Sequence, residues 1–158
     1  MTTRFHGFTL IELLVTVMIL SVLAMGALPV MQVTAQRIKE NELRSSLRQL
    51  RDAIDAYKHA VDEGRIVKNA DQSGYPPTLE ILVEGVPDEK DAAKKKIRFL
   101  RRIPRDPMNA DSELSAAETW GKRSYASEYD APEEGADVYD VYSLSERQGV
   151  NGQPYASW

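Results

Sequence analysis

The feature that most constrains this chain is an uncharged apolar run close to its N-terminus. Residues 13–31 are 19 residues without a charge. The run is interrupted only by two hydroxyl residues, a glycine and a proline: Thr16, Ser21, Gly26 and Pro29. As a helix rising 1.5 Å per residue it would be about 28 Å long, close to the hydrocarbon thickness of a bilayer. The sequence therefore predicts one membrane-spanning helix that begins a few residues into the chain.

Two simpler interpretations of this run are a cleaved secretory signal and a plain single-span anchor. Secretory signals have apolar regions of about 7–15 residues followed by a small-residue cleavage site, and neither property fits here. Charge does not decide the orientation of the span. Arg4 precedes it, but Arg37 and Lys39 follow it, so both flanks are basic.

A single carboxylate, Glu12, lies at the start of the apolar helix. An acid in a membrane helix costs about 2.5–3.5 kcal/mol at the centre and less near an end, so a counter-charge is expected. Cleavage between Gly7 and Phe8 would create one, the α-amine of Phe8, four residues from Glu12. The amine of a neighbouring helix staggered by about one turn could also reach Glu12, which would favour side-by-side assembly. The alternative is that Glu12 extends to the lipid headgroups.

The segment Gly7-Phe8-Thr9-Leu10-Ile11-Glu12-Leu13-Leu14-Val15 resembles the signal shared by type IV pilins and the pseudopilins of type II secretion. The resemblance implies that a prepilin peptidase cleaves after Gly7 and methylates the new N-terminal Phe8. It also implies that Glu12 and Pro29 serve assembly, with Pro29 kinking the helix. A proline that is merely tolerated near the end of a span remains the alternative for Pro29.

A second apolar pattern follows the membrane run. Its members are spaced alternately four and three residues apart: Leu43, Leu47, Leu50, Ile54, Tyr57 and Val61. This spacing predicts an amphipathic helix, continuous with the first because no proline lies between Pro29 and Pro76, and ending near Gly64. The stripe covers fewer than three heptads, so it favours a soluble domain packed on the helix over a coiled coil.

The C-terminal part resembles the major pseudopilin, the G subunit of type II secretion, in the order of its short motifs. These are Tyr75-Pro76-Pro77-Thr78-Leu79, Ile103-Pro104-Arg105-Asp106-Pro107, Trp120-Gly121, Tyr139-Asp140-Val141-Tyr142-Ser143-Leu144 and Trp158. The resemblance implies an α+β, pilin-like fold, in which a long N-terminal helix packs on a small antiparallel sheet. Residues 124–129 and 138–144 are the predicted strands. The expected organisation is a leader (1–7), a transmembrane assembly helix (8–33), an amphipathic stalk (34–63) and a globular periplasmic domain (64–158).

Two departures from the G-subunit pattern affect the expectations. Residues 108–119 separate Pro107 from Trp120, which predicts an inserted surface loop. The aspartate-rich calcium loop that the resemblance implies is replaced by residues 143–152, whose only acid is Glu146. Calcium takes six to eight oxygen ligands, with carboxylates prominent among them. We therefore expect no cofactor and hypothesise that calcium is dispensable.

Opposite charges gather in two segments of the globular part. The basic members are Lys94, Lys95, Lys96, Arg98, Arg101, Arg102 and Arg105, and the acidic members are Glu128, Asp130, Glu133, Glu134 and Asp137. Arg101 and Arg102, with Glu133 and Glu134, are candidates for a charge patch between subunits. Two solvated faces are the alternative. Phe99 is the only aromatic in the basic segment, so nucleic acid is not the expected partner.

No catalytic constellation is visible, so no enzyme is expected. His6 lies in the predicted leader, and His59 is the sole remaining histidine. The expected function is a structural subunit of a secretion pseudopilus. The expected partners are other copies of itself, the prepilin peptidase, other pseudopilins and an inner-membrane assembly platform. A type IV pilin for motility, adhesion or DNA uptake is the alternative, although the absence of cysteine leans against it. A single-span anchored enzyme or adaptor is a third possibility.

Overall fold

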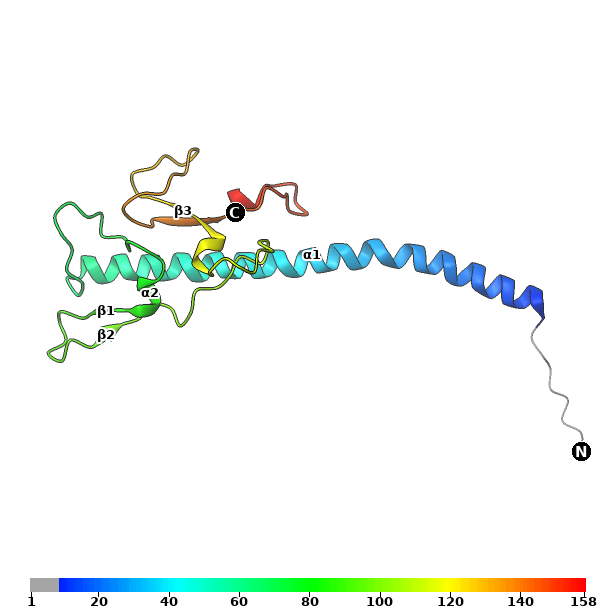
Figure 1. Ribbon diagram of the computed structural model, residues 1–158, viewed down its shortest axis with the longest axis horizontal. Coiled ribbons are helices and arrows are strands. Elements are labelled where there is room, and N and C mark those ends of the chain that lie inside the picture. Colours follow the sequence, from blue (N-terminus) through cyan, green and yellow to red (C-terminus); the bar gives the residue numbers. More distant parts are fainter. Residues whose placement is uncertain (1–8) are drawn as a thin grey trace, which may run out of the picture. The chain divides into compact units, whose positions relative to one another are not determined.

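The computed structural model describes residues 9–158, apart from the side chains of residues 25–30. Its longest element is α1 (Leu10–Asp62), a helix of 53 residues. Short elements follow along the rest of the chain (Figure 1): α2 (Ile81–Glu84), β1 (Val86–Pro87), β2 (Lys96–Ile97), η1 (Ala117–Thr119), β3 (Trp120–Arg123), β4 (Asp140–Ser143) and η2 (Tyr155–Ser157). The chain divides into two compact units, Met1–Arg37 and Ile38–Trp158. The predicted α+β class is confirmed.

The end of α1 is fixed by a glycine, as the sequence predicts. Gly64 adopts a φ of +71°, a conformation that side chains with a Cβ rarely tolerate. The Gly64 amide donates to the carbonyl of Val61, and the Arg65 amide donates to that of Ala60, both at 2.9 Å. This pair of bonds is the Schellman arrangement, which satisfies carbonyls at a helix end. The expected stop near residue 63 is therefore confirmed.

The core of the second unit forms on one stripe of α1. Every predicted member of the stripe is buried, from Leu43 to Val61. The residues that cover it come from the segments after the helix: Leu79, Leu82, Trp120, Val141 and Tyr155. A soluble domain therefore packs on the amphipathic part of the helix, as predicted.

Two antiparallel hairpins make up the sheet structure of the described residues. β1 pairs with β2, and β3 pairs with β4 with Gly121 opposite Tyr142. A Cβ at position 121 would collide with the ring of Tyr142. The glycine of the Trp120-Gly121 motif thus lets the Tyr142 ring lie across the neighbouring strand.

The strand predicted at residues 124–129 is wrong, because the chain turns there. The Ser127 amide donates to the carbonyl of Ser124, and the Ser124 hydroxyl donates to Asp137 at 2.9 Å. The strand lies earlier, at Trp120–Arg123, where β4 offers a partner. The strand predicted at 138–144 is confirmed in shorter form as β4.

The predicted insertion, residues 108–119, is a loop that ends in η1. The Arg105 guanidinium braces it by donating to the carbonyls of Asp111 and Leu114. Beyond β4, residues 144–154 form a second irregular segment that leads into η2. These two loops carry the departures from the G-subunit pattern.

Candidate functional site

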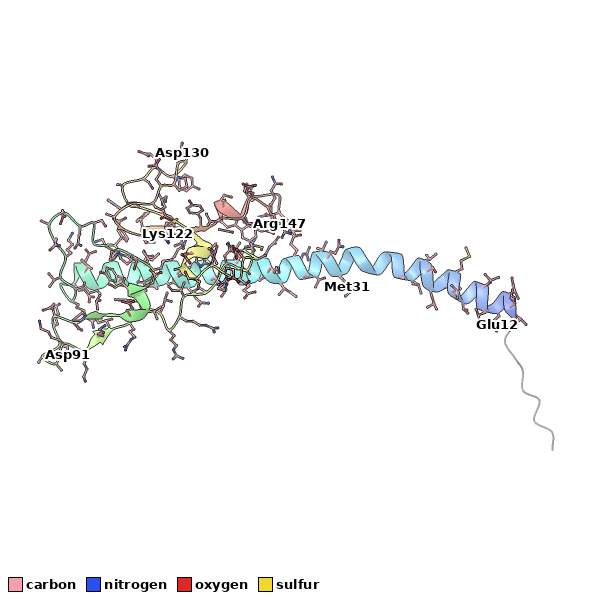
Figure 2. The ribbon with its side chains drawn as sticks, in the orientation of Figure 1. Glu12, Met31, Asp91, Lys122, Asp130 and Arg147 are labelled. Atoms are coloured by element: carbon pink, nitrogen blue, oxygen red, sulfur yellow. The ribbon has the colours of Figure 1, made fainter. Side chains whose placement is uncertain are left out.

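Glu12 lies in the first turn of α1 and takes part in a reciprocal helix cap (Figure 2). Its main-chain N–H donates to Thr9 Oγ1 at 3.3 Å, and its Oε2 accepts a long hydrogen bond of 3.5 Å from the Thr9 N–H. This is a capping box, in which Ser or Thr and a Glu three residues later satisfy each other's amides. An acid in the first turn also faces the positive end of the helix dipole. The pattern Thr9-x-x-Glu12 could have revealed this role, but the sequence reasoning missed it.

The cap gives Glu12 a partner within its own chain. Pairing of its carboxylate with the amine of another chain stays a prediction. Gly7 and Phe8, the predicted processing residues, lie outside the described residues. So does the side chain of Pro29, and the predicted kink is not tested.

The first unit presents a continuous apolar surface. Its large apolar side chains between Leu10 and Leu23 are each 48–81% exposed. The two hydroxyls within this stretch bond back to their own helix, Thr16 to the carbonyl of Leu13 at 2.9 Å and Ser21 to that of Val17 at 2.7 Å. Their polarity is therefore satisfied locally, and the surface remains suited to an apolar environment.

Over the described residues, no helix combines the length and the apolar character that crossing a membrane requires. The span predicted at residues 13–31 includes residues 25–30, whose side chains lie outside that description.

The basic residues of this segment are all exposed, but they have different roles. Lys94 pairs with Glu89 at 3.1 Å, and Arg105 braces the inserted loop. Within the described part of the chain, neither Arg101 nor Arg102 takes part in a salt bridge, and both are exposed. Lys95 and Arg98 are likewise exposed and outside the salt bridges of this part of the chain, so these four cations are available to another molecule.

The members of the acidic segment also have different roles. Asp137 is a structural acceptor: its carboxylate takes hydrogen bonds from the hydroxyls of Ser73 and Ser124 and from the Tyr125 amide. Glu134 lies 3.7 Å from the Lys122 ammonium, and both Glu133 and Glu134 are exposed. The structure therefore leaves Glu133 and Glu134 at the surface, whereas Asp137 serves the fold.

The two charged segments lie on different sides of the helix within the second unit. In Figure 1 the β1–β2 hairpin and β3 flank α1 on opposite sides. Figure 2 labels Lys122 and Asp130 on the acidic side, and Asp91, from the β1–β2 connection, on the other. Within the described part of the chain, no salt bridge joins Arg101 or Arg102 to Glu133 or Glu134. Opposite charges on opposite sides suit a contact between different copies.

A metal centre finds no support among the residues that the structure describes. No three acidic or histidine side chains there are placed to hold a metal ion. His59 is exposed in the last turn of α1.

Comparison with known proteins identifies first an N-terminal motif and then the family of the chain. Residues 2–28 match the prokaryotic N-terminal methylation motif, which places the chain among the proteins that carry this motif. The chain is 32% identical to the type II secretion system core protein G of Klebsiella pneumoniae over 115 residues, which cover 70% of this chain and 74% of the relative. It is 31% identical to the protein of the same name from Escherichia coli K12 (70% and 71% covered) and 29% identical to that of Dickeya chrysanthemi (77% and 75%). No solved structure matches it significantly.

The chain belongs to the type II secretion system core protein G family. The family resemblance drawn from the sequence is thereby confirmed.

Proposed function

We propose that the chain is the structural subunit of a type II secretion pseudopilus. A prepilin peptidase removes residues 1–7 and methylates Phe8, and residues 8–33 hold the subunit in the inner membrane with residues 64–158 in the periplasm. Copies then polymerise through their N-terminal helices, with the assembly platform and other pseudopilins, into a short periplasmic fibre that drives protein export. The subunit performs no chemistry of its own.

The observation that carries this proposal is the exposed apolar surface of α1 between Leu10 and Leu23. Soluble monomers rarely leave a large contiguous apolar patch in water, and such patches mark membrane or protein contacts. A helix that leaves the bilayer for the periplasm must exchange its lipid contacts for protein contacts, since water would otherwise cover its apolar side chains. Packing of neighbouring helices against each other supplies that cover.

The position of Glu12 supports the same assembly. Its carboxylate accepts from the amide of Thr9, the residue that follows Phe8. Cleavage after Gly7 would place a new positive charge on Phe8, one residue from that amide. The Glu12 carboxylate lies near the position of the new amine. It would favour the charged form of that amine, whether the amine belongs to the same chain or to a neighbouring one.

The charged surfaces support a head-to-tail contact between copies. The basic segment begins in the β1–β2 hairpin, and the acidic segment follows β3, which lies on the opposite side of α1 (Figure 1). A contact between two different patches is heterologous, and repetition of such a contact builds an open filament. Electrostatic complementarity would fix the register of the contact more than its strength.

The experiment separates the charge of Glu12 from its capping role. Glu12→Gln removes the charge, yet glutamine at this position still completes a capping box. Thr9→Ala removes the hydroxyl half of the cap, at about 0.5–2 kcal/mol of helix stability, but keeps the charge. Each full-length variant is expressed in cells that lack the native gene. Exported protein in the medium and sheared fibres are then measured.

We expect Glu12→Gln to abolish fibres and export, and Thr9→Ala to retain both. Glu42→Gln, a change at an exposed acid further along α1, is the matched control and should behave as wild type. Normal fibres with Glu12→Gln would refute the proposed role of the charge. Loss of export without loss of a surface pilus would separate the secretion function from that of a type IV pilin.

A further inference from the structure

The last irregular segment of the chain is held by contacts with the rest of its domain. Residues 147–155 follow β4, and their internal contacts are short-range: the isolated bridge between Gln148 and Pro154, and hydrogen bonds from the amides of Gly149, Gly152, Gln153 and Tyr155 to the Gln153 carbonyl, the Gly149 carbonyl, Asn151 Oδ1 and the Arg147 carbonyl, respectively. Such a loop would gain much of its order from contacts with the rest of the domain. We call residues 147–155 the C-terminal loop.

Glu40, on α1, lies beneath this loop with only 6% of its surface exposed. Its Oε1 accepts a hydrogen bond from the Val150 amide at 2.8 Å and another from the Tyr155 hydroxyl at 3.0 Å. Tyr155 is itself fully buried. A buried carboxylate is strongly unfavourable unless hydrogen bonds replace its hydration, so these bonds couple the loop to the helix.

Two basic residues on α1 hold the parts of the chain on either side of the loop. Arg51 donates from Nε to Asp140 Oδ1 and from Nη2 to the main-chain oxygen of Trp158, both at 2.8 Å. The Arg44 guanidinium stacks 4.2 Å from the ring centre of Trp158. Glu40, Arg44 and Arg51 are four and seven residues apart, so they share one face of the helix. The C-terminal segment thus docks on a charged strip of α1.

The residues around the loop do not fit the calcium ion that the resemblance to the G subunit implies. Glu146 is exposed, beside Arg147. The nearest buried or half-buried acids already accept from protein donors: Glu40 from the loop, Asp140 from Arg51, and Asp106 from the Ser143 hydroxyl. A calcium site needs six to eight oxygens converging on one point. No trio of acids or histidines converges in the described part of the chain.

The polarity of the loop is also opposite to that of a cation site. A bound cation is surrounded by oxygen acceptors, whereas this loop directs two donors, the Val150 N–H and the Tyr155 O–H, at one carboxylate. We propose that the C-terminal loop is organised around the buried Glu40 carboxylate in place of a calcium ion, so that its order depends on Glu40 and not on calcium. This inference concerns the fold of one subunit and stands whether or not the fibre forms.

The test is hydrogen–deuterium exchange of the full-length chain in detergent, with either millimolar calcium chloride or a calcium chelator present. In wild type, we expect amide exchange in the C-terminal loop and the melting temperature to be the same under both conditions. In Glu40→Ala, exchange at Val150 and its neighbours should rise at least tenfold, again independently of calcium. Glu42→Ala, at an exposed acid two residues away, should leave exchange unchanged.

Tyr155→Phe keeps the buried ring but removes one of the two donors, so it should raise loop exchange by less than Glu40→Ala does. It also covers the case in which Glu40→Ala unfolds the domain, which would appear as lost protection of the β3–β4 amides. Protection of the wild-type loop by calcium, or wild-type exchange in both variants, would overturn the proposal.

Discussion

The two units of the chain handle their apolar residues in opposite ways. In the second unit, α1 buries its stripe against later segments of the same chain, and Leu50 is fully inaccessible. In the first unit the large apolar side chains of the same helix remain open, and Leu20 is 64% exposed. One helix thus has apolar side chains that its own chain buries and apolar side chains that its own chain leaves exposed. We propose that lipid or other subunits cover the apolar side chains of its first part, whereas later segments of the same chain cover those of its second part.

The largest expected difference between the units comes from shortening one leucine in each. Leu50→Ala should lower the free energy of unfolding of the second unit by about 2–5 kcal/mol, because it leaves a cavity in a closed core. Leu20→Ala should change it by no more than about 0.5 kcal/mol, because it removes exposed surface. Guanidinium unfolding of the detergent-solubilised chain, followed by the fluorescence of Trp120 and Trp158, measures both. Equal losses would contradict the division into two units.

A somewhat smaller loss is expected at a buried acid of the second unit. Asp106 is 1% exposed, and its carboxylate accepts from the Ser143 hydroxyl and from the Met108 amide at 2.7 Å. Asp106→Ala should cost about 1–3 kcal/mol, because these buried donors lose their partner. Asp52→Ala, at an exposed acid on α1, is the control, and the same unfolding experiment applies. A cost no larger than that of the control would show that Asp106 does not hold the insertion to β4.

The second unit should also lose stability in acid, because one of its ion pairs involves an aspartate. The pair joins Arg65, which follows α1 in the sequence, to Asp88. The Arg65 guanidinium, 2.6 Å from Asp88 Oδ2, holds the pKa of Asp88 below its ordinary value of about 3.9. The folded state therefore binds fewer protons than the unfolded state. The pair stabilises the fold above pH of about 4, and this contribution disappears as pH falls through the lowered pKa.

Unfolding midpoints between pH 7 and pH 3 test this sign. Asp88→Asn should be less stable than wild type at pH 7, and the difference should shrink as the pH is lowered. A constant difference over that range would mean that the charge of Asp88 contributes nothing to stability.

The smallest effect on stability, combined with an effect on assembly, is expected at the exposed arginines. Arg101→Glu with Arg102→Glu should leave the melting temperature of the subunit nearly unchanged, because exposed charges contribute little. Fibre yield should fall, since the proposed contact with Glu133 and Glu134 of another copy becomes repulsive. Glu133→Lys with Glu134→Lys in the same chain should restore it. An unchanged fibre yield with Arg101→Glu and Arg102→Glu alone would show that the charge patch does not serve assembly.

Local patterns in the sequence predicted the parts of the fold that depend on neighbouring residues. The periodic stripe identified the buried face of α1, and Gly64 identified its end. The strand expected at residues 124–129 failed because its composition suits a strand but β4 pairs with the segment before it. A single strand cannot be placed from composition alone, since its stability comes from the partner.

The contacts of the charged face of α1 could not be predicted in the same way. Periodicity assigns Arg44 and Arg51 to a polar, solvated face, yet they contact Trp158 and Asp140 from the far end of the chain. Glu40 is also buried, because the loop that contains Val150 and Tyr155 folds over it. Such contacts depend on how a distant loop folds back, which no local pattern encodes. The capping box of Thr9 and Glu12 is different, because its spacing was visible in the sequence.

The central claim is that other subunits cover the first part of α1 after the chain has been cut between Gly7 and Phe8. Intact-mass spectrometry of the protein purified from membranes tests it most directly. The account predicts a chain that begins at Phe8 and carries one additional methyl group. A mature protein that keeps residues 1–7 would contradict it.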